Sequence, residues 1–409
     1  MTHTRRTALL LSASVGLMMT GFGVIMPVFA RRLGELGGGV ADLGLMTMSF
    51  ALAHMVLSPA AGGLSDRIGR RPLILLGLVG FALSNVLYLL APTTAWFIAA
   101  RAVAGVLTAG LYPAAMGAVD DISAPKERAS NVGLVMAGYG FGLVIGPVVG
   151  GISYEMMGFT APFIVSGILG VVAAIAAGIL VPETKTPGVA ASETSCAASG
   201  VASRFAWLPR PLRLLGALLA IELSLTFAFA YVEPQMVFYV YDALGWSTAQ
   251  FGIVASCYGV ALALGQGFLS KASDTAGRRP VIVLGLVLAL ALYVGLATVE
   301  TFAPMLAAAF VAGLGTGLVG PALAALALDI TAAEHRGRVL GLKSAASSAG
   351  GVLGPLGIAL VGGVVGPTTV FFSAACIVAA GLVLAVVALP RPNNAAATDH
   401  VRGQHHQTA

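Results

Sequence analysis

The chain contains 409 residues, of which 58% are hydrophobic and only 10% are charged, with a formal net charge of +5. A soluble domain carries about 25% charged residues, so this composition excludes an ordinary soluble globular protein. It predicts an all-α membrane protein, because helices satisfy their own backbone hydrogen bonds, as lipid requires. We interpret the basic excess as the charge bias of membrane-protein loops, and we expect the lipid bilayer, not a nucleic acid, as the partner.

Apolar runs follow one another along almost the whole chain. A hydrocarbon core about 30 Å thick needs roughly 20 apolar residues per helix. The first run follows the segment Met-Thr-His-Thr-Arg-Arg and has no clear cleavage site, so we expect a retained helix and not a signal peptide. Twelve transmembrane helices are predicted, at about 8–30, 43–64, 73–92, 95–119, 130–154, 161–181, 213–236, 248–270, 280–298, 302–328, 339–362 and 367–389.

The sidedness follows from the basic residues. Lys and Arg are concentrated in the N-terminal segment, in alternate loops and in the C-terminal tail, which predicts a multi-pass protein of the cell (inner) membrane with both termini cytoplasmic. A Ser/Ala/Thr/Pro-rich stretch without an apolar run is typical of a flexible linker. We expect an N-terminal six-helix half at 1–182, a cytoplasmic linker at 183–210, a C-terminal six-helix half at 211–390 and a disordered cytoplasmic tail at 391–409.

The two halves contain an internal repeat at a constant offset of 208 residues. The pattern D-x-x-G-R-R-P at 66–72 recurs at 274–280, and the pattern G-x-x-x-G-P at 142–147 recurs at 350–355. Asp121 likewise matches Asp329. Parallel repeats of this kind predict two pseudo-symmetric six-helix bundles, with the substrate site between them near the membrane midplane.

Three segments resemble motifs of one known family. Gly62–Pro72 is similar to the cytoplasmic loop 2–3 motif of the major facilitator superfamily. Arg101–Gly105 resembles the fourth-helix motif of its proton-coupled members, and Gly142–Gly151 matches its fifth-helix antiporter motif at every fixed position. The resemblance extends over nearly the whole chain. It implies the major facilitator fold and a 12-helix drug/proton antiporter similar to tetracycline and multidrug exporters.

That resemblance implies secondary active export of a lipophilic drug-like small molecule in exchange for protons, by alternating access. Two alternatives remain open: a transporter of a sugar or small metabolite, and a non-transporting membrane receptor. The sequence contains no GxxxxGK[ST] loop, no HExxH, no GxSxG and no clustered His and Cys. We therefore expect no enzymatic activity, no cofactor and no metal site, and we expect a monomer.

The charged loop after the second span has two interpretations. Its basic residues could serve only to orient the helices in the membrane. Alternatively, an arginine placed between carboxylates at the ends of the second and fourth spans could hold the cytoplasmic side closed and so bias a two-state equilibrium. The residues of this predicted conformational latch are Asp66, Arg67, Gly69, Arg70, Arg71 and Asp121.

The antiporter motif of the fifth span is rich in small residues. Glycines four residues apart let helix backbones approach closely, and a proline inside a helix removes a backbone donor and favours a kink. The motif is either ordinary close packing or a bend between the halves that limits proton leak. Its fixed positions are Gly142, Gly146, Pro147, Gly150 and Gly151.

Ionisable residues inside a membrane span mark candidate proton or ion pathways. Arg101 lies in the fourth span, where it either lines a cavity or snorkels towards the helix end. Glu222 and Glu233 share one face of the seventh span, and a carboxylate there could bind either a proton or a cationic drug, although Glu233 could also be interfacial. His54 is either a packed residue or a proton relay. These four residues are the predicted proton-coupling groups.

Aromatic and amide residues on the expected cavity helices suit a large apolar pocket with a few polar groups. The predicted substrate-binding residues are Phe22, Tyr112, Tyr139, Phe229, Gln235 and Tyr258.

Overall fold

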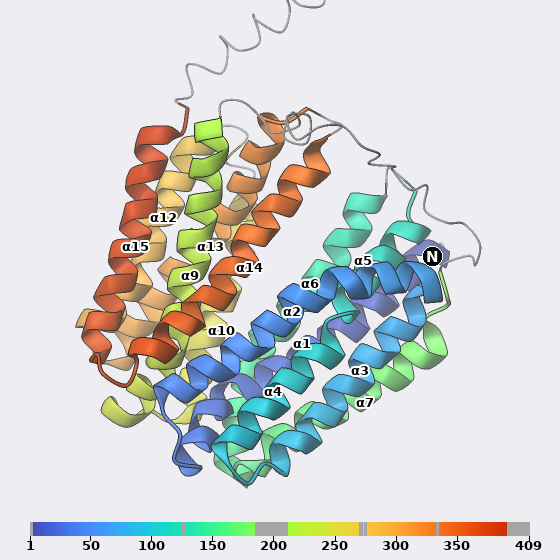
Figure 1. Ribbon diagram of the computed structural model, residues 1–409, viewed down its shortest axis with the longest axis horizontal. Coiled ribbons are helices and arrows are strands. Elements are labelled where there is room, and N and C mark those ends of the chain that lie inside the picture. The colour runs from blue at the N-terminus through green and yellow to red at the C-terminus, as the bar shows by residue number, and fades with distance from the viewer. Residues whose placement is uncertain are drawn as a thin grey trace, which may run out of the picture. The chain divides into compact units, whose positions relative to one another are not determined.

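The computed structural model describes residues 3–124, 127–184, 212–269, 273, 276–332 and 335–390, which contain helices and no strand. Figure 1 shows these helices with their labels, and most of them are long. Over the described residues, 12 helical segments are long and apolar enough to cross a membrane. This confirms the predicted all-α fold with twelve spans.

The first half contains the six predicted spans in seven helices. The fourth span, predicted at 95–119, is interrupted after Thr108, and its two parts together form one candidate span from Thr94 to Ile122. At the interruption, a Cβ added to Gly110 would lie 2.8 Å from Leu73 Cδ1, so a glycine lets the third and fourth spans approach closely. The helices are α1 (His3–Glu35), α2 (Val40–Ile68), α3 (Arg70–Leu89), α4 (Thr94–Thr108), α5 (Leu111–Ile122), α6 (Arg128–Met157) and α7 (Thr160–Leu180).

The second half contains six spans, two of which continue from an α-helix into a turn of π-helix. The first of these turns, η1, extends α9, and the second, η2, extends α10. The elements are α9 (Leu212–Phe238), η1 (Tyr239–Ala243), α10 (Thr248–Leu264), η2 (Gly265–Leu269), α12 (Arg278–Thr298), α13 (Phe302–Asp329), α14 (Arg336–Val361) and α15 (Pro367–Ala388).

The chain groups into two compact units by its internal contacts. The first unit comprises Met1–Cys196, Ala230–Gly259 and Gly351–Pro367, and the second comprises Ala197–Phe229, Val260–Gly350 and Thr368–Ala409. Within the first unit, α1 packs along α6 and α7, while α3 packs against α7 and α4. Within the second unit, α12 packs along α13. Of the predicted linker at 183–210, only Glu183 and Thr184 are among the described residues, and the predicted tail at 391–409 lies outside them.

Four aromatic rings form a core in the first unit. Phe29 of α1, Tyr88 of α3, Phe97 of α4 and Phe163 of α7 have ring centroids 5.3 to 6.3 Å apart, and all four side chains are buried. Such tilted and edge-on arrangements are the favoured geometries of aromatic pairs. The cluster joins side chains of α1, α3, α4 and α7, and Arg101 lies one turn further along α4 than Phe97.

Candidate functional site

Arg70, at the start of α3, connects the ends of three helices. Its Nη2 lies 2.7 Å from Asp66 Oδ1 at the end of α2, and its Nε lies 2.9 Å from Asp121 Oδ2 at the end of α5. Its Nη1 also donates to Ser65 Oγ at 3.2 Å. Arg67, by contrast, is exposed and forms no ion pair with the described residues. We call Asp66, Arg70 and Asp121 the Arg70 cluster.

The second half repeats part of this cluster at the 208-residue offset. Arg278 Nε lies 3.0 Å from Asp329 Oδ2, and Arg278 Nη1 donates to Ser273 Oγ at 2.8 Å. These three residues are equivalent to Arg70, Asp121 and Ser65. Asp274, the equivalent of Asp66, lies outside the described residues.

The second arginine of each repeated motif also has equivalent contacts. Arg71 donates through Nη2 to the backbone carbonyl of Gly178 on α7. Arg279 donates through Nη2 to the backbone carbonyl of Val386 on α15. Since 178 and 386 also differ by 208, the repeat seen in the sequence extends to contacts with the last helix of each half.

Glu183 makes a further contact at this end of the first half. Its equivalent position in the second half, 391, lies outside the described residues. Glu183, which follows α7, accepts hydrogen bonds from the backbone N–H of Arg70 at 2.9 Å and of Arg71 at 3.1 Å. A carboxylate at a helix N-terminus is favourable because the unpaired N–H groups carry partial positive charge. Gly69, with φ of 107°, makes the approach possible, since a Cβ there would lie 2.5 Å from Glu183 Oε2.

The antiporter motif packs one face of α6 against α1. A Cβ added to Gly142 would lie 2.5 Å from Gly16 O, and one added to Gly146 would lie 2.6 Å from Gly23 Cα. Gly150 is equally crowded by the backbone of α1. Because the obstructing atoms are backbone atoms, they cannot move aside as a side chain would. Glycine is therefore required on this face by close helix packing.

The other motif positions pack α6 against α10. A Cβ added to Gly151 would lie 2.5 Å from Thr248 O. Gly252 of α10 in turn faces the backbone carbonyl of Pro147, with no room for a Cβ. The motif thus holds α6 in backbone contact with two helices at once.

Arg101 is held inside a cage of aromatic rings. Its guanidinium carbon lies 4.0 Å from the ring centroid of Phe50, 4.8 Å from that of Phe29 and 4.9 Å from that of Phe22. Arg101 is 6% exposed, and its Nε has no hydrogen-bond partner among the described residues. Cation–π attraction of this kind is strongest when the cation is desolvated. It compensates in part for the cost of burying the charge.

Other predicted residues gather near this cage. His54 Nε2 lies 2.9 Å from Thr108 Oγ1, and its ring stacks at 4.5 Å on Phe50. Glu233 belongs to the same unit as Arg101, and the two charges are within electrostatic range of each other. Phe22, predicted as a substrate contact, is part of the cage. The unit thus places a histidine, an arginine and a glutamate in one region.

The remaining predicted substrate residues are dispersed. Tyr112 and Tyr139 meet edge to face with ring centroids 6.3 Å apart. Gln235 is buried in the first unit, which also contains Tyr258, whereas Phe229 belongs to the second unit.

A buried ion pair occupies the second unit. Lys343 Nζ of α14 lies 3.0 Å from Glu222 Oε1 of α9, with side-chain exposures of 16% and 10%. The positions equivalent to Glu222 and Lys343 in the first half are Ser14 and Val135. The pair therefore has no counterpart in the first half. Both of its charges lie within candidate membrane-spanning helices.

A comparison with protein families decides the classification. The model described as "Major Facilitator Superfamily" matches residues 9–241 and 218–407. The chain belongs to the major facilitator superfamily. It is accordingly a multi-pass membrane transporter and not an enzyme, and the resemblance found in the motifs is confirmed.

Individual relatives include drug-resistance proteins of this superfamily. The quinolone resistance protein NorA of Staphylococcus aureus is 26% identical over 347 residues, covering 84% of this chain and 86% of the relative. The class C tetracycline resistance protein of Escherichia coli is 28% identical over 349 residues, with the same coverage of both chains.

Solved structures of transporters share the fold. The human organic anion transporter MFSD10 superposes with a TM-score of 0.68 at 19% identity, over 94% of this chain and 100% of that one. A bacterial homologue of the human lysosomal transporter Spinster gives a TM-score of 0.70 at 17% identity, over 94% and 95%.

Lys343 is a site residue that the sequence does not single out. It lies just inside the predicted eleventh span at 339–362, close to the basic residues of the preceding loop. A comparison of the two halves would have indicated Lys343. At the 208-residue offset, Lys343 corresponds to an apolar valine in the first half, and Glu222 corresponds to a serine.

Proposed function

We propose that this transporter exports lipophilic cationic compounds across the cell (inner) membrane in exchange for protons, as a monomer with both termini in the cytoplasm. The observation that carries the proposal is the buried ion pair of Glu222 and Lys343. Support also comes from the antiporter motif and from relatives that are named for resistance to quinolones and tetracycline.

The ion pair offers a simple coupling mechanism. A carboxylate buried in a membrane span needs a positive partner, and in this structure Lys343 supplies it. We infer that a proton or a cationic drug can replace Lys343 at Glu222, but that the two cannot bind there together. Competition for one carboxylate couples drug exit to proton entry. Lys343 meanwhile keeps Glu222 neutralised when neither is bound, which limits uncoupled proton movement.

The groups around Arg101 provide a second part of the proton route. Arg101 is buried among aromatic rings and has no ion-pair partner within 4.0 Å among the described residues, and Glu233 and His54 lie within its electrostatic range. We propose that Glu233 takes up the proton on this side and that the fixed charge of Arg101 favours its release. His54 relays the proton along the same region.

The Arg70 cluster is the proposed latch of alternating access. Arg70 joins the ends of α2, α3 and α5 through two ion pairs, and Arg278 joins α12 to the end of α13 through an equivalent one. Partly exposed ion pairs contribute only about 1 kcal/mol or less each. Contacts of that strength can bias an equilibrium between two states without locking it.

Accumulation of a cationic dye in cells tests this function. The chain is expressed in a host that lacks its main efflux pumps, and dye uptake is followed with and without a protonophore. We expect reduced accumulation that the protonophore abolishes. Glu222→Gln should abolish the effect, and Glu300→Gln, a charge removal at an exposed loop position, should not. Equal accumulation with and without expression, across several cationic drug classes, would refute the proposal.

A further inference from the structure

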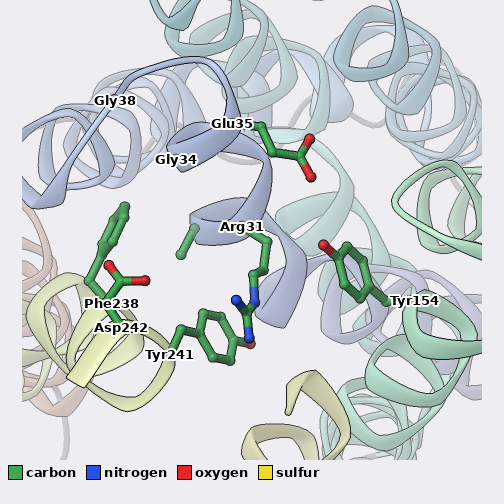
Figure 2. Close-up of a pocket in the computed structure, with 9 residues that line it drawn as sticks. Arg31, Gly34, Glu35, Gly38, Tyr154, Phe238, Tyr241 and Asp242 are labelled. Carbon is green, nitrogen blue, oxygen red and sulfur yellow. The ribbon is translucent and has the colours of Figure 1, made fainter. Parts of the chain in front are cut away.

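Two adjoining cavities lie in the first unit, where α1 ends and η1 begins. Their volumes are about 460 and 370 Å³, within the range of roughly 300–1,000 Å³ that is typical of small-molecule sites. Both are lined by Gly38, Phe238 and Asp242. Figure 2 shows the larger one, with Phe238 and Asp242 on one side and Tyr154 and Glu35 on the other. None of the residues that line them belongs to the Arg70 cluster or to the Glu222–Lys343 pair.

In the larger cavity, two of the charged side chains are already engaged. Arg31 donates through Nη2 to the backbone carbonyl of Trp246 at 3.0 Å, and its guanidinium lies 4.1 Å from the ring centroid of Tyr241. Glu35 pairs with Arg32 at 3.1 Å. Asp242 forms no ion pair or hydrogen bond with the described residues. Its carboxylate is therefore the charge in these walls that is open to a ligand.

The smaller cavity is lined by Asp242 and Gln235, among others, and both of these side chains can accept hydrogen bonds. Among the described residues that line it, Asp242 is the one that carries a charge. Gln235 also lines it and is 5% exposed, and its Oε1 is buried without a hydrogen-bond partner among the described residues. Burying an acceptor without a hydrogen-bond partner costs free energy, so a ligand group that donates to this oxygen would be stabilised. The Asp242 carboxylate and the Gln235 oxygen both accept hydrogen bonds, and the negative charge of Asp242 disfavours an anion in this cavity.

The surrounding residues favour an organic cation over a metal ion. Phe238 and Tyr239 are among the residues that line the smaller cavity, and aromatic faces attract organic ammonium groups. A divalent metal would need about six oxygen ligands, and the described residues hold no group of three His, Cys, Asp or Glu side chains suited to one. Tyr239 and Asp242 both lie in the π-helical turn η1, a local geometry that is frequent at functional sites.

We propose that the smaller cavity binds a protonated amine, whose N–H groups donate to Asp242 and Gln235 while its aromatic or apolar part extends past Phe238 into the larger cavity. The cavity lies at the end of the first unit where α1 finishes, opposite to the end that holds the Arg70 cluster. The cavity would then be a second binding position for the transported cation, on the outer side of the membrane. This assignment rests on the proposed function.

Binding to the purified full-length protein in a non-ionic detergent tests the proposal. Three fluorescent probes share one dansyl-alkyl body and end in a primary ammonium, a trimethylammonium or an acetylated amine, and fluorescence anisotropy gives their affinities. The primary ammonium should bind most tightly. Asp242→Asn should weaken it at least about tenfold, because the asparagine oxygen still accepts a hydrogen bond but no longer carries the opposite charge, and Gln235→Leu should weaken it by about threefold or more. Glu300→Gln should leave it unchanged.

Asp242→Asn is a nearly isosteric change at an exposed position that has no hydrogen bond or ion pair with the described residues, so the variant should fold like the parent, as thermal unfolding can verify. Unchanged affinity in Asp242→Asn, or equal binding of the acetylated probe, would overturn the proposal. Equal affinities of the primary and trimethyl probes would overturn its hydrogen-bonding component. This measurement needs no membrane gradient, so a failure here is distinguishable from a failure of export in cells.

Discussion

Removing one member of the Glu222–Lys343 pair should destabilise the protein more than removing both. The two charges are 3.0 Å apart and nearly buried, and at an effective dielectric constant of about 20 they attract by roughly 5 kcal/mol. Loss of one partner from a buried pair costs about 3–5 kcal/mol, because the other charge is left uncompensated, whereas an apolar replacement of both is often neutral.

A double-mutant cycle measures this coupling. Glu222→Gln and Lys343→Met are made singly and together, and the thermal unfolding midpoint of each purified variant is recorded in detergent. Both single variants should unfold several degrees below the parent, and the double variant should recover most of the loss. The exchanged pair Glu222→Lys with Lys343→Glu should also fold, but without transport. If the double variant loses the sum of the two single losses, the ion pair does not stabilise the fold.

Three further predictions follow from the other contacts. Gly146→Ala should reduce folded yield by overpacking at a cost of about 1–3 kcal/mol, and Gly140→Ala, where a Cβ has open space, should be tolerated; similar yields of the two would contradict the packing argument. Asp66→Asn should lower efflux by up to about fivefold, the factor that about 1 kcal/mol sets, while membrane expression stays normal, and undiminished efflux would remove the Arg70 cluster as a latch. Gly69→Ala should lower the unfolding midpoint more than Gly63→Ala, because Gly69 has φ of 107° and faces Glu183 whereas Gly63 has open space; equal midpoints would contradict this.

Much of the architecture follows from the sequence because it depends on local composition and repetition. Each apolar run is long enough to cross the membrane, and a helical segment of the structure covers most of each run. Some helices also extend into the polar flank, as α2 does to Ile68. The 208-residue repeat anticipates that Arg70 and Arg278 have equivalent environments, and both meet an aspartate at the end of a later helix. Motif spacing alone also indicates the superfamily.

The side-chain environments could not be predicted in the same way, because they depend on which distant helices become neighbours. Glu222 is predicted as a membrane carboxylate that binds a proton or a cationic drug, but its partner Lys343 lies 121 positions further along the chain, on another helix. Arg101 is expected to face a cavity or a partner, and it is held by three phenylalanines of α1 and α2. The sequence does not single out Asp242 as a candidate ligand-binding residue, because the cavity that it lines also requires residues of α1.

Proton movement in proteoliposomes tests the central claim of drug/proton exchange most directly. The purified transporter is reconstituted with a pH-sensitive dye in the lumen, and a cationic substrate is added under an imposed pH gradient. The proposed mechanism predicts that substrate transport in one direction moves protons in the other, and that Glu222→Gln abolishes both movements. Substrate transport that proceeds at the same rate without a pH gradient, and without any change in luminal pH, would contradict it.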